Sequence, residues 1–302
     1  MIDAPSSTWF TASPHWHWLI VAHFMLSGLA GGTYFLSAMI DLAGRERDRR
    51  VARLGYLVTL PLLAVIGVVL VVDLGRPDRF WHLFIANHTL TPMFKYWVPM
   101  SIGSWGVTAF GIFALLSFVA AFAEWRHPDW KFARRLRPPG WIGTLVAVPG
   151  AFFALVITGY TGVMIAVLNR PIWSDTPLFG LLFLVSAVTM GAALLALGAR
   201  WLGWQSPAVA ALQRIWAWLL AVQVLVLIAL FLWLGPAARG WLNHWGIVLA
   251  IGIAVGIVWP LVSTLRRRPL GESGLPVAAA MILAGAVLVR TAIVFVPDVI
   301  AP

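Results

Sequence analysis

The sequence predicts an all-α integral membrane protein with eight transmembrane helices. Of its 302 residues, 61% are hydrophobic and only 11% are charged, whereas a soluble domain has about 25% charged residues. Apolar runs of about 20 residues, the length that crosses a bilayer, recur along the chain. The basic residues gather in short segments between these runs, where they orient a membrane protein. The net charge of +10 therefore does not indicate nucleic-acid binding.

The eight predicted spans follow one another with short connections. The first carries a face of small residues, the second ends in a charged segment, the third opens at Pro99, and the fourth ends before Asn169. Many of the 18 Trp residues lie near span ends, as interfacial anchors do. The predicted spans are 16–40, 54–74, 100–123, 141–168, 177–199, 211–234, 244–265 and 276–296.

The distribution of basic residues predicts the orientation of the spans. Of the 21 Lys and Arg residues, 15 lie in or beside the connections after spans one, three, five and seven. The positive-inside rule places these connections in the cytoplasm and both termini outside it. We interpret the basic residues in them as mostly plain topology signals. The expected location is the cell (inner) membrane, in multi-pass form.

An internal repeat divides the chain into two predicted four-helix halves, 1–170 and 171–302. Residues 24–32 in span one resemble residues 183–191 in span five, at an offset of 159. Residues 74–81 after span two resemble 234–241 after span six, at an offset of 160. The shared offset predicts two halves in parallel orientation. Only the first half has a long polar segment after its second span, so we expect the functional site there.

Ionisable and aromatic residues gather at the outer ends of the first four spans. Such groups at a membrane boundary are costly unless they are paired, hydrated or functional. A binding site that passes protons needs groups that both form hydrogen bonds and exchange protons, and His can do both near neutral pH. Ordinary interfacial residues and structural ion pairs are the competing interpretation. The residues concerned are His15, His17 and His23 in span one, then Asp73, Arg76, Asp78, Arg79, His82, His88 and Lys95.

Three segments resemble the NrfD/PsrC family, the membrane subunit of polysulfide-reductase-like complexes. Residues 73–80 are similar to its Asp-Leu-Gly-x-Pro-x-Arg-Phe signature, and residues 99–105 to a Pro-Met-Ser-x-Gly-x-Trp run. Tyr160 with Gly162, followed by Pro171 and Trp173, is similar to its Tyr-x-Gly and Pro-x-Trp runs. The resemblance covers residues 16–200 strongly and the second half weakly.

The resemblance implies a subunit that passes electrons between the quinone pool and an external enzyme. It implies menaquinone or ubiquinone near the outer (periplasmic) face, a four-cluster iron–sulfur partner and a catalytic subunit, often a molybdopterin enzyme. We expect His17, His23, Asp73, Lys95 and Tyr160 to form the quinone site, without a catalytic residue for the terminal substrate. We expect the partner to dock on Arg76, Asp78 and Arg79.

Other readings of the sequence remain open. A secondary transporter also has two halves, although the polar groups here lie at one face and not at the midplane. A purely structural membrane anchor is the third possibility. The chain has no Cys and no plausible pair of His ligands for a membrane haem, so we expect no haem, iron–sulfur cluster or metal in it. Arg290 in span eight needs an anion or carbonyls, and we expect Asp73 or Asp298 to serve.

Overall fold

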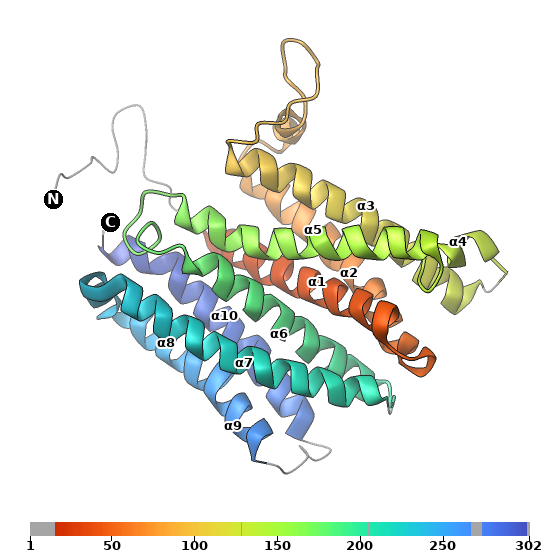
Figure 1. The fold of residues 1–302 in the computed structure, drawn as a ribbon. Coiled ribbons are helices and arrows are strands. Elements are labelled where there is room, and N and C mark those ends of the chain that lie inside the picture. Colours follow the sequence, from red (N-terminus) through yellow and green to blue (C-terminus); the bar gives the residue numbers. More distant parts are fainter. Residues whose placement is uncertain (1–15, 128, 205, 267–273, 301–302) are drawn as a thin grey trace.

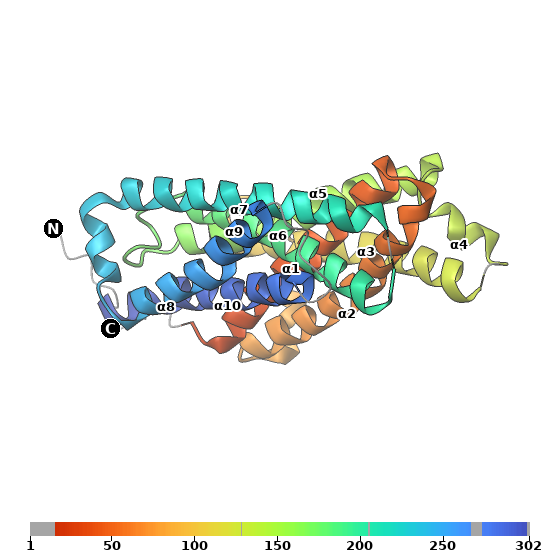
Figure 2. The same cartoon turned by 90° about the horizontal axis from the view of Figure 1, so that it is seen from below.

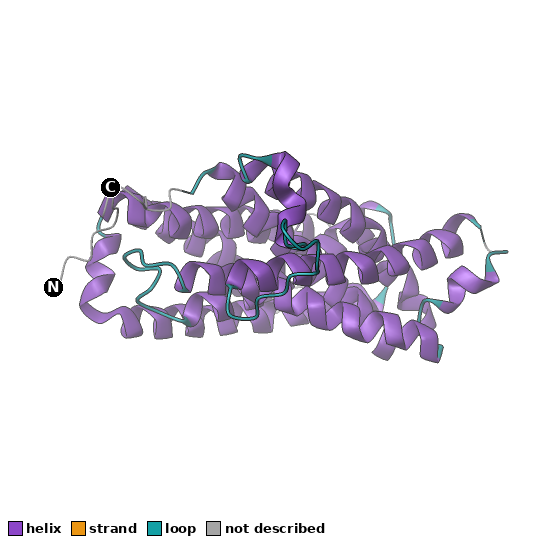
Figure 3. Cartoon of the chain, turned by 90° about the horizontal axis from the view of Figure 1, so that it is seen from above, coloured by secondary structure: helices purple, strands orange, loops and turns teal. Residues whose placement is uncertain are grey.

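The described part of the protein consists of helices joined by loops, with no strand (Figure 3). The structure is a computed structural model, and it describes residues 16–127, 129–204, 206–266 and 274–300. The elements are α1 (Trp18–Ala43), η1 (Glu46–Asp48), α2 (Arg49–Asp73), η2 (Pro77–Leu83), α3 (Pro99–Arg126), α4 (Lys131–Arg135), α5 (Trp141–Ala166), α6 (Leu178–Trp201), α7 (Pro207–Leu234), η3 (Gly235–Trp241), α8 (His244–Ile253), η4 (Ala254–Val258), α9 (Trp259–Leu265) and α10 (Gly274–Ile300).

Eight helical segments of the described residues are long and apolar enough to cross a membrane. They confirm the predicted all-α, multi-pass membrane fold, with α8, η4 and α9 together forming the seventh segment. The long helices run along one axis of an elongated bundle (Figures 1 and 2). We call the end that carries η2 the shelf end. We call the opposite end, which carries α4 and the α1–α2 connection, the basic end.

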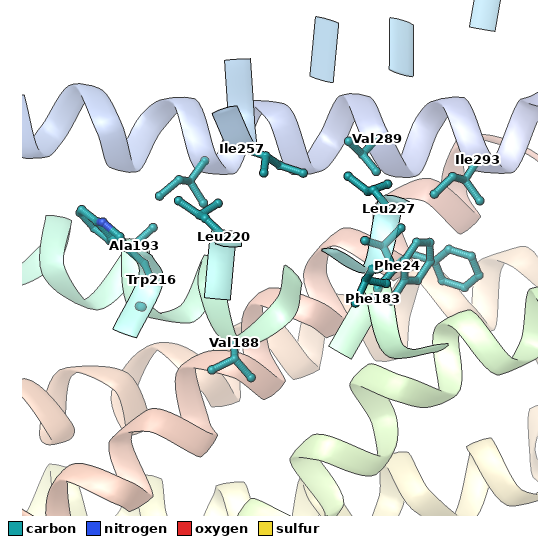
Figure 4. Close-up of a cluster of buried hydrophobic side chains, with 14 of the residues drawn as sticks. Phe24, Phe183, Val188, Ala193, Trp216, Leu220, Leu227, Ile257, Val289 and Ile293 are labelled. Carbon is teal, nitrogen blue, oxygen red and sulfur yellow. The ribbon is translucent and has the colours of Figure 1, made fainter. Parts of the chain in front are cut away.

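Helices α1 and α6 pack against each other in the centre of the bundle. A side chain at Gly32 would overlap the backbone of Ala187, and one at Gly191 would overlap the backbone of Gly32. The rings of Phe24 and Phe183 lie 5.8 Å apart in an edge-to-face arrangement (Figure 4). Residues at matching positions of the sequence repeat therefore touch each other at this crossing.

The repeat also appears where the second span of each half ends. Gly75 after α2 has a φ of 65°, and Gly235 after α7 has a φ of 49°, backbone conformations that glycine adopts without strain. A 3₁₀ turn with Arg79 or Arg239 follows each glycine. Beyond this point the halves differ. The polypeptide runs through residues 84–98 before α3 begins, whereas α8 starts soon after η3.

A buried ion network fixes the basic end of the first four long helices. The guanidinium of Arg137 donates to both oxygens of Asp41, at 2.5 and 2.7 Å, and to Glu124 at 2.5 Å. Arg49 donates to the carbonyl of Pro138 at 2.6 Å and pairs with Glu124 at 3.5 Å. Arg137 and Asp41 are almost fully buried. Arg49 and Arg137 therefore hold helices together, a role that the sequence interpretation did not assign to these basic residues.

Candidate functional site

The charged groups of the shelf end lie on the surface of the first half. Asp73 ends α2 and is half-buried, and the backbone then turns at Gly75 into η2. Arg79 approaches its neighbour Asp78 at 3.9 Å, and their side chains are 59% and 72% exposed. Arg76 is also exposed. The three predicted docking residues are thus accessible to another protein.

The segment between η2 and α3 folds back onto the start of α3. Trp105 donates from its indole nitrogen to the carbonyl of Met93 at 3.0 Å, and its ring lies 5.5 Å from that of Phe84. The backbone N–H of Lys95 donates to the hydroxyl of Ser101 at 3.0 Å. Because these bonds hold its backbone, the exposed side chain of Lys95 projects from a fixed point.

The histidines of α1 lie in two different environments. His17 stands at the N-cap of α1 and is exposed. His23 is only 6% exposed, and its Nδ1 lies 3.1 Å from the hydroxyl of Ser27. His15 falls outside the described residues. The structure therefore leaves His17 exposed at the start of α1 and directs His23 toward Ser27 of its own helix.

Tyr160 lies on α5 with its phenol against α3. A Cβ at Gly103 would overlap the hydroxyl and ring of Tyr160, so the ring fills the space left by the missing side chain. The neighbouring Thr158 and Thr161 both donate to carbonyls of α5. Within the described residues, by contrast, the Tyr160 hydroxyl makes no hydrogen bond. This hydroxyl is not among the fully buried unpaired atoms of the described residues, and Tyr160 is half-buried.

The structure does not join the predicted quinone residues into one connected cluster. Tyr160 lies against Gly103, and His23 lies against Ser27. Helix α1 packs on both α2 and α5, and α3 packs on α2 and α5, so these residues belong to adjoining helices. No hydrogen bond joins His23, Asp73 and Tyr160 in the part of the protein that the structure describes. That part also has no group of three or more His, Cys, Asp or Glu residues able to hold a metal.

The expected pairing of Arg290 with Asp73 or Asp298 was wrong. Arg290 donates to the hydroxyl of Ser186 at 2.9 Å and to the carbonyl of Ala286 at 3.4 Å. Its guanidinium carbon lies 4.9 Å from the ring centre of Phe183. Asp298 instead pairs with Arg170 at 2.5 Å. Short polar groups and a ring face solvate the buried cation where a carboxylate was expected.

Sequence reasoning named Tyr160 but missed that Gly103 makes room for it. The signal available was that Gly103 and Tyr160 both lie near the shelf end of their spans, within the motif-like segments. Sequence reasoning also missed Asp41 and Glu124, the acids of the ion network. An acid near the basic end of an apolar span should have suggested a partner among the basic residues.

Comparisons with known proteins identify the family of this chain. It is 24% identical over 216 residues to a selenate reductase subunit of Mesobacillus selenatarsenatis, a match that covers 61% of this chain and 48% of the relative. It is 26% identical over 184 residues to a polysulfide reductase subunit of Wolinella succinogenes, a match that covers 58% and 55% respectively. The chain spans about half the length of these relatives. The family described as "Polysulphide reductase, NrfD" matches residues 10–300, so this multi-pass membrane protein belongs to the NrfD family.

Proposed function

We propose that this chain is the quinone-reactive membrane subunit of a respiratory oxidoreductase complex. It passes electrons between the quinone pool and an external enzyme with iron–sulfur and molybdopterin subunits. Membership of the NrfD family supports this proposal, as do the two relatives whose names are those of subunits of a selenate and a polysulfide reductase. The complex sits in the inner membrane, with the shelf end toward the periplasm.

One observation carries the proposal furthest: the phenol of Tyr160 packs on Gly103 and has no hydrogen-bond partner among the described residues. Polar groups in an apolar setting are normally paired, so this hydroxyl fits the carbonyl oxygen of a bound quinone. Menaquinone or ubiquinone supplies a two-electron, two-proton couple when bound. Tyr160 and His23 donate hydrogen bonds to it, and Lys95 reaches the site from the anchored segment at residues 84–98.

Asp73 and His17 handle protons at the mouth of this site. Asp73 ends α2 and His17 caps α1. His17 is exposed to water, and Asp73 is half-buried. The two residues thus connect the half-buried end of α2 to the aqueous phase. The exposed Arg76, Asp78 and Arg79 receive the iron–sulfur subunit beside them.

The test compares quinone-linked activity of the purified complex in three variants. Loss of a hydrogen bond to a developing charge costs roughly 1.5–3 kcal/mol, or about tenfold to a hundredfold in turnover. We expect Tyr160→Phe and His23→Leu to slow quinone turnover by this factor. Tyr96→Phe, which removes a 72% exposed phenol from the same end, leaves turnover unchanged.

Activity of the catalytic subunit with a soluble electron carrier serves as the control for assembly in all three variants. Full quinone turnover in both Tyr160→Phe and His23→Leu would remove this site from consideration. A complex that binds no quinone at all would favour the structural anchor. Transport of a solute by the protein in vesicles would favour the secondary transporter.

A further inference from the structure

A cavity lined by several basic residues lies at the basic end of the described residues. It has a volume of about 670 Å³ and lies between the ends of α2, α3 and α5, with α4 along one side. Five basic and two acidic side chains line it. Lys131, Arg134 and Arg135 come from α4, and Arg49 comes from the start of α2. None of these residues belongs to the proposed quinone site at the opposite end.

Of the two acids that line the cavity, Glu124 is paired with arginines of the protein, and Glu46 is exposed. Glu124 binds Arg137 at 2.5 Å and also approaches Arg49 at 3.5 Å and Arg53 at 3.9 Å. The two carboxylate oxygens of Asp41 accept hydrogen bonds from Nε and from one terminal nitrogen of Arg137. Burial opposes the charge of Arg137, but the hydrogen bonds and charges of Asp41 and Glu124 outweigh it and raise its pKa above the ordinary value. Arg137 therefore stays charged and paired with Asp41 and Glu124.

The positive charge of α4 is left facing the cavity. Lys131 and Arg135 are exposed and form no ion pair within the described part of the protein. The side of the cavity formed by α4 thus offers the ammonium of Lys131 and the guanidinium of Arg135 next to Arg134, while Glu46 is the exposed acid of the lining. A cavity of this charge attracts an anion. Arg and Lys together suit a phosphate group, which accepts several charge-assisted hydrogen bonds.

The surroundings of the cavity match a membrane boundary. Trp125, Trp130 and Trp141 are each at least half exposed around it, and the guanidinium of Arg126 lies 4.4 Å from the centre of the Trp125 ring. Exposed tryptophans are typical of the headgroup level. From Trp141, one face of α5 continues toward the middle of the span with exposed Leu145, Val148 and Phe152. A basic cavity therefore opens onto an apolar stripe.

We propose that this cavity binds the headgroup phosphate of an anionic phospholipid, whose acyl chains lie along the exposed face of α5. Basic pockets at helix ends on the cytoplasmic side of membranes suit such lipids. A free phosphate ion has the same charged oxygens as the headgroup, but it has no acyl chain to contact the exposed apolar face of α5 at residues 141–152. The stripe is the reason to assign the site to a lipid.

The test titrates the purified full-length protein with lipids in detergent and measures binding by native mass spectrometry. The probes are phosphatidylglycerol and phosphatidylethanolamine with identical acyl chains, and separately inorganic phosphate and glycerol 1-phosphate. We compare the double variant Lys131→Gln/Arg135→Gln with Arg47→Gln/Arg50→Gln. The second variant removes the same charge from exposed residues at the same end, outside the cavity.

Each basic residue near an anionic lipid contributes about a factor of five in affinity. We expect the cavity variant to bind phosphatidylglycerol about 25-fold more weakly, and the control variant to change by less than about threefold. Phosphatidylethanolamine should bind at least about tenfold more weakly than phosphatidylglycerol to the unaltered protein. An unchanged unfolding temperature in both variants shows that the fold is intact.

Equal affinity of the two variants for phosphatidylglycerol would overturn the site. Displacement of the lipid by inorganic phosphate or glycerol 1-phosphate at comparable concentration would show that the cavity binds a soluble anion. That result would overturn the proposal of a lipid site. Failure of the two soluble probes to compete, together with the 25-fold loss, is the result that supports the proposal.

Discussion

The phenol of Tyr160 on α5 occupies the space in which a side chain of residue 103 on α3 would stand. Two segments that lie far apart in the sequence thus share one position in space. Replacing Gly103 by Ala forces a methyl group against the ring, and overpacking of this kind typically costs about 1–3 kcal/mol. Because the α5 ring is the more movable partner, we expect Gly103→Ala to displace the Tyr160 hydroxyl and reduce quinone turnover about tenfold.

Gly111 on the same helix is the matched control. A methyl group there meets no other atom within 4 Å, so Gly111→Ala should leave quinone turnover unchanged. Turnover is measured on complexes with equal content of the catalytic subunit. Equal turnover in the two variants would show that the position of Tyr160 does not matter for the reaction.

The crossing of α1 and α6 makes a second pair of glycines informative. A methyl group at Gly32 would overlap the Ala187 carbonyl, so Gly32→Ala must separate two central helices. Gly67 on α2 has no atom within 4 Å of the same added methyl, and Ala in a helix is favoured over Gly by roughly 0.5–1 kcal/mol. We expect Gly32→Ala to lower the unfolding temperature in detergent and Gly67→Ala to keep or raise it. The reverse order would contradict close packing at the crossing.

The ion network at the basic end predicts a large loss of stability when one acid is neutralised. Asp41→Asn removes one of the two carboxylates that pair with the buried Arg137 and leaves only Glu124. Breaking a buried pair typically costs about 3–5 kcal/mol. Asp78→Asn breaks an exposed pair at the shelf end, which contributes about 0–1 kcal/mol. Chemical denaturation of both purified variants measures the difference. Similar unfolding midpoints would mean that the buried network contributes little.

Docking of the iron–sulfur subunit over the first half can be tested with residues matched by the repeat. Arg79 and Arg239 are both exposed and both belong to a 3₁₀ turn after a positive-φ glycine. Arg79→Glu should weaken retention of the partner on this protein, since like charges at an interface cost several kcal/mol. Arg239→Glu should not. Iron content after affinity purification through this protein gives the readout, and equal iron in both samples would move the docking surface elsewhere.

The orientation in the membrane can be tested because the sequence has no Cys. Asn87 is exposed at the shelf end and Arg47 at the basic end. In intact cells, Asn87→Cys should react with a membrane-impermeant thiol reagent, and Arg47→Cys should react only after the cells are opened. Labelling of Arg47→Cys alone would invert the topology. The basic residues at 45–53 and 126–137 are the physical reason for the expected result.

The spans were predictable because apolar length is a strong local signal that the bilayer imposes on any crossing helix. The ends of the helices were predictable to a few residues, since Pro99 and Pro207 open α3 and α7 and glycines follow α2 and α7. The packing of α1 on α6 was not predictable in the same way. It depends on a contact between Gly32 and Gly191, and a small-residue face does not say which helix it meets.

The site was predictable in composition and not in arrangement. Ionisable groups at one end of the spans drew attention to His17, Asp73 and Tyr160. Their positions relative to one another depend on how α1, α2, α3 and α5 pack, which a single sequence does not encode locally. Arg290 shows why electrostatic guesses fail. A carboxylate was expected by charge balance, but the hydroxyl of Ser186, the Ala286 carbonyl and the Phe183 ring surround the cation.

The meeting of Phe24 with Phe183 and of Gly32 with Gly191 has the form of a contact between two copies of one surface. On the axis of a two-fold dimer, residue i of one copy meets residue i of the other. We propose that two separate four-helix proteins could assemble through this same surface, with the present protein as their covalently joined equivalent. Joining two copies removes the requirement that they stay identical. One copy can then keep the long segment between η2 and α3, while in the other α8 follows η3 within a few residues.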